Sequence, residues 1–186
     1  MGQLRIIGGI HRSRIIKFKD NIDGLRPTPD RVRETVFNWL GQTLNGKTCL
    51  DLFAGSGAMG FEAISRGAKS VMMIEANKSV YPDLVNNAKL LKIAGGSPVG
   101  EIDLKLQDAI NYINQGSQSF DIIFIDPPFD SDLLQISLNA LRASQLLNEN
   151  SKIYIECQKL PDLTGYKVIK EGKAAMVRFF LIKVGV

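Results

Sequence analysis

The chain has 186 residues, of which 45% are hydrophobic and 23% are charged, as is typical of one globular domain with an apolar core. It contains no run of about 18 apolar residues, the length that a membrane helix needs, and its start, MGQLRIIGG, lacks the apolar segment of a signal peptide. His11 is the only histidine, which excludes histidine-based metal sites and histidine-dependent triads. We therefore expect a metal-free, monomeric, cytoplasmic protein without a membrane anchor.

The excess positive charge lies at one end of the chain. The net charge is +4; residues 1–19 hold five basic residues and no acidic one, whereas residues 41–186 hold fifteen of each sign. A run of like charges is usually a solvated surface, but its confinement to one arm favours contact with nucleic-acid phosphates. The candidate phosphate-binding residues are Arg12, Arg14, Lys17, Arg26, Arg31 and Arg33.

The arm, residues 1–25, is expected to form a β-hairpin ahead of a main domain that spans residues 26–186. Residues 4–18 contain two short β segments broken at Gly8-Gly9, where we expect a hairpin turn or a bulge. Arg12 and Arg14 lie two positions apart, so both would point to one face of a strand.

Residues 26–40, RPTPDRVRETVFNWL, begin as a turn and become a helix that Thr28 or Asp30 can cap. The apolar stripe at helical spacing consists of Val32, Val36, Phe37 and Leu40. We interpret Phe37 and Trp39 as core residues and not as a ligand platform.

From residue 47 onward the pattern alternates strand and helix, which predicts an α/β fold with right-handed crossovers and a parallel sheet. The expected strands are Thr48–Phe53, Ser70–Glu75, Leu104–Gln107, Asp121–Asp126 and Lys152–Glu156, with helices near residues 58–66, 78–93, 108–115 and 132–146. Cys49 and Cys157 fall in this strand pattern as buried free thiols. Residues 95–98, GGSP, are expected to form a loop.

The end of the chain departs from the alternation. Two strands around Glu171-Gly172-Lys173 are expected to form an antiparallel hairpin, with Met176, Phe179, Leu181 and Ile182 on its buried side. The predicted fold is thus a doubly wound, seven-stranded, mostly parallel sheet with a carboxyl-terminal antiparallel hairpin and an amino-terminal β-hairpin arm.

The most informative stretch is FDIIFIDPPF, Phe120–Phe129. Four apolar residues, 122–125, indicate a strand buried on both faces. Pro127 has no N–H and Pro128 restricts the residue before it, so the strand must end at Asp126.

This corner suits the binding of a planar base by its exocyclic amino group. The Asp126 carboxylate and the Pro127 carbonyl can accept the two N–H bonds, and Phe129 can stack on the ring, which is worth roughly 1–3 kcal/mol per base. Taken alone, the tetrapeptide is equally compatible with an ordinary strand-to-loop turn.

A glycine-rich turn follows the first strand of the sheet. DLFAGSGAMG, Asp51–Gly60, places Gly55, Gly57 and Gly60 where glycine permits close backbone approach to a ligand. Dinucleotide enzymes use such a turn too. Asp51 opposes a pyrophosphate, however, and suits a cofactor with a cationic end, such as S-adenosylmethionine; it can also be a buried turn acid held by backbone N–H groups.

Acids follow the next two strands as well. Glu75, twenty residues after Gly55, can hold both ribose hydroxyls, and Asp108 can accept from an adenine amino group, with Ala109 leaving room beside the ring. Each of these acids can instead be a helix cap or a turn residue. The series of acids after successive strands is more specific than the glycines.

These motifs resemble a known family. DLFAGSGAMGFEAISRGA with Glu75, Asp108 and DPPF is similar to the Rossmann-fold S-adenosylmethionine-dependent methyltransferases that act on amino groups. LRIIGG and RPTPDRVRETVFNWL narrow the resemblance, nearly end to end, to the bacterial RsmD family of 16S ribosomal RNA guanine-N2 methyltransferases. One departure is His11-Arg12-Ser13-Arg14, where the family has a glycine between the arginines.

The resemblance implies methyl transfer to the N2 atom of one guanine, guanine 966, of 16S ribosomal RNA in the small subunit or its assembly intermediate. The product cofactor would be S-adenosylhomocysteine, and no metal would take part. The implied cofactor-binding residues are Asp51, Phe53, Gly55, Gly57, Glu75, Asp108 and Ala109, and the implied catalytic residues are Asp126, Pro127, Pro128 and Phe129. Whether Arg26, Arg31 or Arg33 faces the cofactor's carboxylate stays open.

Two other interpretations remain. An adenine-N6 methyltransferase of DNA or RNA also uses a DPPF-type corner, but DNA-reading enzymes generally carry a recognition domain for which this chain has no insertion. The chain could also be a nucleotide- or RNA-binding module without catalysis.

Overall fold

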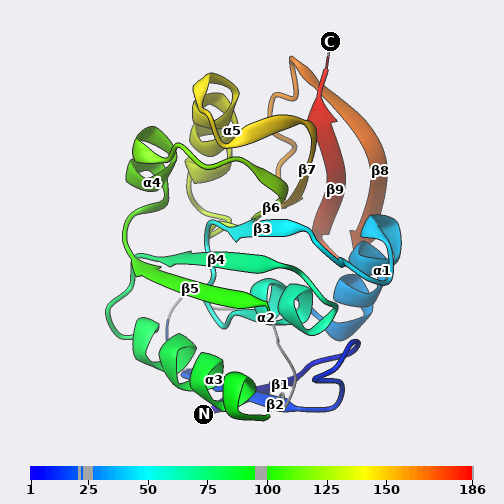
Figure 1. Ribbon diagram of the computed structural model, residues 1–186. Helices are drawn as coiled ribbons and strands as arrows, with labels where there is room; N and C mark the ends of the chain where they lie inside the picture. Colours follow the sequence, from blue (N-terminus) through cyan, green and yellow to red (C-terminus); the bar gives the residue numbers. More distant parts are fainter. Residues whose placement is uncertain (21, 23–26, 95–99, 186) are drawn as a thin grey trace.

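The computed structural model describes residues 1–20, 22, 27–94 and 100–185. A seven-stranded sheet forms the centre, with strand order β5-β4-β3-β6-β7-β9-β8 (Figure 1). The parallel strands are β3 (Thr48–Asp51), β4 (Ser70–Glu75), β5 (Glu101–Leu106), β6 (Phe120–Ile125) and β7 (Leu147–Cys157). β8 (Tyr166–Ala174) and β9 (Val177–Val184) form the antiparallel hairpin at one edge. The predicted doubly wound sheet is confirmed.

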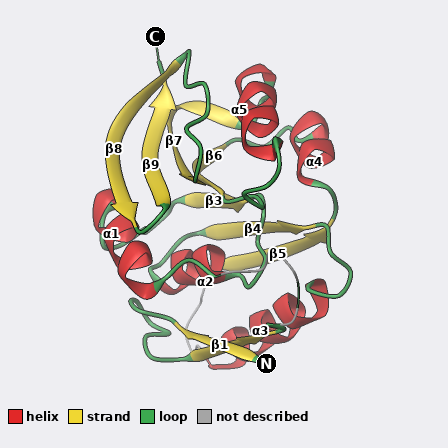
Figure 2. Cartoon of the chain, turned by 180° about the vertical axis from the view of Figure 1, so that it is seen from behind, coloured by secondary structure: helices red, strands yellow, loops and turns green. Residues whose placement is uncertain are grey.

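Helices cover both faces of the sheet. Apolar residues of α1 (Asp30–Leu40), α2 (Ala58–Ser65) and α3 (Tyr81–Ala94) pack in one core cluster. Residues of α4 (Ala109–Gln115) and α5 (Leu133–Ala143) pack in the cluster on the opposite face (Figure 2). β6 separates the two clusters, because its alternating side chains Ile122 and Phe124 point to one and Ile123 and Ile125 to the other.

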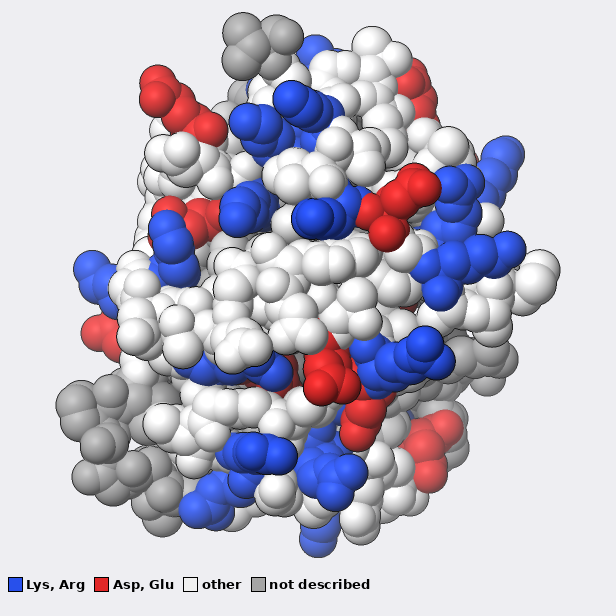
Figure 3. Space-filling view, turned by 90° about the vertical axis from the view of Figure 1, so that its right-hand side faces the viewer, with Lys and Arg blue, Asp and Glu red and all other residues white. Residues whose placement is uncertain are grey.

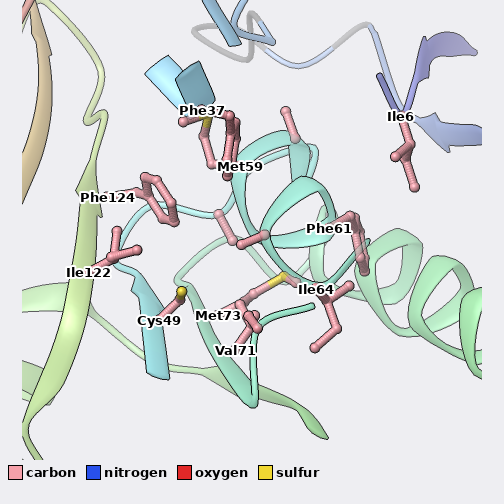
Figure 4. Packing of buried hydrophobic residues seen from close by; sticks show 14 of the residues in the cluster. Ile6, Phe37, Cys49, Met59, Phe61, Ile64, Val71, Met73, Ile122 and Phe124 are labelled. Carbon is pink, nitrogen blue, oxygen red and sulfur yellow. The ribbon is translucent and has the colours of Figure 1, made fainter. Parts of the chain in front are cut away.

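The amino-terminal hairpin is docked on the domain. β1 (Gly2–Arg5) and β2 (Ile15–Phe18) pair antiparallel, and their apolar residues, Leu4, Ile6, Ile16 and Phe18, belong to the same buried cluster as α2. All eight residues of α2 are buried, because the helix lies between the sheet and this hairpin. Figure 4 shows part of that packing, with Phe37, Met59 and Phe124 close together and Ile6 entering from the arm. The arm is therefore integrated into the core of the main domain.

Several local predictions were wrong. The terminal hairpin turns at Ala175-Met176, not at residues 171–173, and Met176 is 77% exposed. Gly172 lies inside β8, where a Cβ atom would lie 2.4 Å from the Phe179 ring. Neither Thr28 nor Asp30 caps α1, whose N-cap residue is Pro29 without a side-chain hydrogen bond.

Other predictions are confirmed, and some concern residues that are not described. Val32, Val36 and Phe37 are buried, and both cysteines are buried free thiols. The loop predicted at residues 95–98 lies outside the described residues. Within the described ranges no helix is long and apolar enough to cross a membrane.

Candidate active site

The sheet order reverses between β3 and β6. β3 continues through crossovers to β4 and β5 on one side, and β6 continues to β7 on the other. Ligands of open α/β sheets bind at such a switch point, beyond the carboxyl ends of the strands. Asp51, the last residue of β3, pairs with Phe124, so the glycine turn and the DPPF corner leave the sheet side by side.

The glycine turn after β3 has the backbone that only glycine adopts easily. Gly55 and Gly57 have φ angles of 51° and 80°, and a Cβ atom on Gly57 would lie 2.3 Å from the Phe61 ring. Gly57 is also the N-cap residue of α2, and no side chain caps that helix. Glycine at 57 is therefore required by packing against Phe61 and Leu84, and the first N–H groups of α2 are left without a side-chain cap.

Asp51 is buried beneath this turn. Its Oδ2 atom accepts a hydrogen bond of 3.1 Å from the Gly60 N–H group. Burial, with the nearby Glu75 carboxylate, raises the pKa of Asp51 to about 7, although hydrogen bonds from the Gly60 and Phe53 backbone oppose the shift. Asp51 thus has the structural role of a turn acid, and its ionised form would gain from a cationic ligand.

Glu75 and Asp108 also have structural partners. Glu75 is half-buried and accepts from the N–H groups of Gly55 (2.9 Å) and Asn77 (2.7 Å). Asp108 is exposed and caps α4, accepting from the Asn111 N–H group at 2.9 Å. Both carboxylates lie at the carboxyl edge of the sheet, as predicted, and both keep lone pairs for a further donor. Of the two other predicted cofactor residues, Ala109 is buried and Phe53 is half-buried.

The DPPF corner follows β6 at the same edge. Pro127 is buried, whereas Pro128 and Phe129 are exposed, and 37% of the Phe129 surface is accessible. Beyond the corner lies a groove of about 470 Å³, whose lining includes Pro127, Phe129, Leu134, Glu156, Lys159 and Leu160. A flat ring can therefore reach the exposed face of Phe129 from this groove.

A second carboxyl group stands beside Asp126. Ile125 pairs with Ile155 in the parallel ladder, so Asp126, which directly follows β6, lies next to Glu156 of β7. Burial, followed by the Glu156 and Asp51 charges, raises the pKa of Asp126 well above its usual range. Burial likewise raises the pKa of Glu156.

Glu156 was missed by sequence reasoning, and so were its partners. Its Oε1 atom accepts hydrogen bonds from the Tyr154 hydroxyl (2.7 Å) and from the Thr28 hydroxyl (2.9 Å). Thr28 is 128 positions away along the chain and was expected to cap a helix. The sequence did hold one signal for Glu156: it is the last residue of a predicted strand. Asp51, Glu75 and Asp108 already showed that acids at or near such positions gather at one edge of the sheet.

The predicted phosphate-binding residues have different positions. Arg12, Arg14 and Lys17 are exposed on the arm, and Arg31 is exposed on α1. Arg12 and Arg14 lie in and beside the turn between β1 and β2, so the expectation that they share one face of a strand was wrong. Arg26 lies outside the described residues.

Arg33 is not a surface residue, which corrects its prediction as an RNA contact. Its side chain has no accessible surface, and it donates to the carbonyls of Arg5 and Thr28. It also forms ion pairs with Asp30 and with Glu62, the latter at 3.3 Å. Arg33 therefore ties the arm and the turn around Thr28 to α2, and helical periodicity alone could not reveal this role.

Comparison with known proteins identifies the family. A family described as Conserved hypothetical protein 95 matches residues 4–182. Ribosomal RNA small subunit methyltransferase D of Haemophilus influenzae is 37% identical over 185 residues, which cover 97% of this chain and 93% of that protein. The protein of the same name from Escherichia coli K12 is 41% identical over 157 residues, or 84% of this chain and 76% of that one. The chain belongs to the RsmD family.

Solved structures agree with membership of the RsmD family. A putative methyltransferase, yhhF, from Escherichia coli has a TM-score of 0.85 and 37% identity, and the match covers 98% of each chain. A putative methylase from Haemophilus influenzae has a TM-score of 0.79 and 34% identity over 97% of this chain. The Rossmann-like methyltransferase fold predicted from the sequence is confirmed.

Proposed function

We propose that this RsmD-family chain transfers a methyl group from S-adenosylmethionine to the exocyclic N2 atom of a guanine in 16S ribosomal RNA, guanine 966 in the family. One observation carries the proposal: the DPPF corner and the glycine turn leave adjacent strands at the switch point of the sheet. The substrate class comes from the relatives, which are named as ribosomal RNA small subunit methyltransferases.

The residues around the glycine turn fit S-adenosylmethionine. The start of α2, which no side chain caps, would offer backbone N–H groups to the ligand, and Asp51 would balance its cationic end. Glu75 would accept from the ribose hydroxyls and Asp108 from the adenine amino group, in addition to the backbone donors that each already has.

The target amino group would be held by the DPPF corner. The Asp126 carboxylate and the Pro127 carbonyl would accept its two N–H bonds, which favours a pyramidal nitrogen with a free lone pair. Phe129 would stack on the base, after the base has left its own stack at a cost of a few kcal/mol. The chain's main contribution would be positioning of the two reactants.

The bound cofactor would supply an electrophilic methyl group on a sulfonium; transfer would form the N–C bond, leave the C–S electron pair on sulfur and yield S-adenosylhomocysteine. The methylated amine then releases one proton, which the Asp126 carboxylate can accept. The raised pKa of Asp126 makes it a better proton acceptor than an ordinary carboxylate. No metal is required for this transfer. The chain would act as a monomer, with the arm holding the RNA backbone of the small subunit or its assembly intermediate.

The test is Asp126→Ala assayed with labelled S-adenosylmethionine on 16S ribosomal RNA, free and in small-subunit particles. We expect loss of transfer with cofactor binding retained by calorimetry. Asp103→Ala is the control, because Asp103 is an exposed acid on β5, and should transfer normally. Near-normal turnover by Asp126→Ala would refute the assigned role.

Mapping of the product by mass spectrometry separates the alternatives. N2-methylguanosine supports the proposed function, whereas N6-methyladenosine would identify an adenine methyltransferase. Tight RNA binding by the wild type without any transfer would indicate a binding module.

A further inference from the structure

Four lysines that are far apart in the sequence meet on one face of the sheet. Lys167 is directly opposite Lys183 in the β8–β9 ladder. Ile153 is opposite Ile182 in the β7–β9 ladder, and continuing that register by one residue places Lys152 beside Lys183. Lys170 is opposite Leu181. We call Lys152, Lys167, Lys170 and Lys183 the lysine face.

Alternation along the strands assigns all four side chains to the same side of the sheet as α1. Tyr154 and Leu181 belong to the cluster that contains the buried residues of α1, and Lys152 and Lys183 lie two positions from them. In Figures 1 and 2, α1 lies beside the Ala174 end of β8, and no described helix covers this face at the other end of the hairpin. Figure 3 views the β8 side and shows basic side chains close to one another over its upper part.

Nothing in the described part of the chain neutralises these charges. Lys167, Lys170 and Lys183 are exposed and Lys152 is half-buried, and none of the four forms an ion pair with a described residue. Glu171, the acid within β8, pairs with Arg178 and is opposite Phe180, whose side chain points to the other face.

Like charges placed directly opposite in a sheet destabilise it. Neighbouring strands are about 4.8 Å apart, so the backbones of Lys152, Lys183 and Lys167 lie within about 10 Å, one Debye length at about 0.1 M salt. The arrangement is unfavourable for the free protein and becomes favourable when a polyanion lies across it.

We propose that the lysine face binds the phosphate backbone of the RNA substrate, as a second contact surface in addition to the arm; this inference rests on the proposed function. Lys152 precedes Glu156 by four residues on β7, or about 13 Å along the strand. Tyr154 and Leu181 lie buried between the two, in the cluster that α1 covers, so an RNA held at the DPPF groove would pass around α1 to reach the lysine face. The sequence alone does not reveal this surface, because residues 41–186 have no net charge and the lysines come together only through the register of β7, β8 and β9.

The test compares three variants in RNA binding between about 0.05 and 0.2 M salt. The first combines Lys152→Gln, Lys167→Gln and Lys183→Gln. The matched control combines Lys69→Gln, Lys89→Gln and Lys173→Gln, which removes three exposed lysines elsewhere, Lys173 being on the opposite face of the same hairpin. The third replaces the first three lysines by arginine. The probe is a 16S ribosomal RNA transcript, and the melting temperature of each variant is measured in parallel.

We expect the first variant to lose about 2 units of the slope of log affinity against log salt, about 0.7 for each lysine on single-stranded RNA, and to bind about 100-fold more weakly at about 0.1 M salt. The control and the arginine variant should keep the wild-type slope. The first variant should melt at the same or a higher temperature, because a repulsion is removed.

Two results overturn the inference. If the glutamine variant binds RNA as the control does while the wild type transfers methyl groups, the lysine face is not a contact surface and the proposed function stands. If the glutamine variant melts at a lower temperature than the control, the lysines stabilise the hairpin, which contradicts the mutual repulsion on which the inference is built. Absence of methyl transfer by the wild type would remove the proposed function, and the binding curves would still decide whether the lysines contact RNA.

Discussion

Glu62 is the residue whose loss should do most damage to this fold. It is completely buried in α2, and its two oxygens accept from the backbone N–H groups of Ile7 (2.9 Å) and Gly8 (2.8 Å) in the arm. The same oxygens form ion pairs with Arg33 (3.3 Å) and Arg66 (2.8 Å). Glu62→Ala would therefore leave two buried guanidinium groups and two backbone donors without this acceptor.

The size of the destabilisation by Glu62→Ala depends on the contacts that Arg33 and Arg66 would keep. Arg66 would keep the Gln42 carbonyl and its position over the Phe37 ring at 4.8 Å, and Arg33 would keep Asp30. Removing one partner of a buried ion pair destabilises a protein by about 3–5 kcal/mol, against a total unfolding free energy of about 5–15 kcal/mol. We expect a loss in this range, with the arm opening before the sheet.

Urea denaturation measures the change in unfolding free energy, and amide hydrogen exchange measures the opening of the arm. The Ile7 and Gly8 amides should lose protection against exchange. Amides of the central strands should lose only the protection that corresponds to the fall in global unfolding free energy. Glu34→Ala is the control, because Glu34 is an exposed glutamate in α1, and it should stay within about 0.5 kcal/mol of the wild type. A loss below about 1 kcal/mol for Glu62→Ala, with unchanged protection of the arm, would refute the reasoning.

Three further predictions concern the site. Glu156→Gln removes a charge that raises the pKa of Asp126, so the rising limb of the pH–rate profile should move to lower pH. A limb at the wild-type pH would show that the Glu156 charge does not act on Asp126. Because the pKa of Asp51 is raised to about 7, the folded protein binds the extra proton, and its stability should fall as pH rises from about 4 to 7. Cofactor affinity should increase as the pH rises past the pKa of Asp51. Asp51→Asn should remove the pH dependence of both cofactor affinity, measured by calorimetry, and stability, measured by denaturation. Gly57→Ala should destabilise more than Gly46→Ala, since both glycines have positive φ but only Gly57 would place a Cβ atom against neighbouring side chains; equal losses in denaturation would contradict this.

The predicted strands and helices of the sheet agree with the structure, whereas the turn predicted at residues 171–173 and the cap predicted at Thr28 or Asp30 do not. β6 is recognisable because four consecutive apolar residues must be buried on both faces. The segment 171–173 has turn composition but lies in β8, because the Phe179 ring fills the space where Gly172 has no Cβ atom. The actual turn, at Ala175, has a φ of 52° at a residue that carries no turn signal.

Sequence order revealed one half of the site and concealed the other. Asp51, Glu75, Asp108 and Asp126 each lie near or just beyond the carboxyl end of a predicted strand, so their common edge could be inferred from the parallel topology. Thr28 and Arg33 could not be placed in this way, because their partners Glu156 and Glu62 lie on elements whose position against α1 depends on tertiary packing.

These two residues connect the amino-terminal arm with the groove. Arg33 donates to the Arg5 carbonyl at the end of β1 and to the Thr28 carbonyl, and the Thr28 hydroxyl donates to Glu156 beside Asp126. A displacement of the arm must therefore move the turn that carries Thr28, or break a buried hydrogen bond of a charged group, which is worth about 1.5–3 kcal/mol. Since the hydrogen bond from Thr28 lowers the pKa of Glu156 against the effect of burial, a displacement of the arm that breaks it would alter the protonation of the carboxyl group beside Asp126. The position of the arm is thus coupled to the electrostatics of the candidate site.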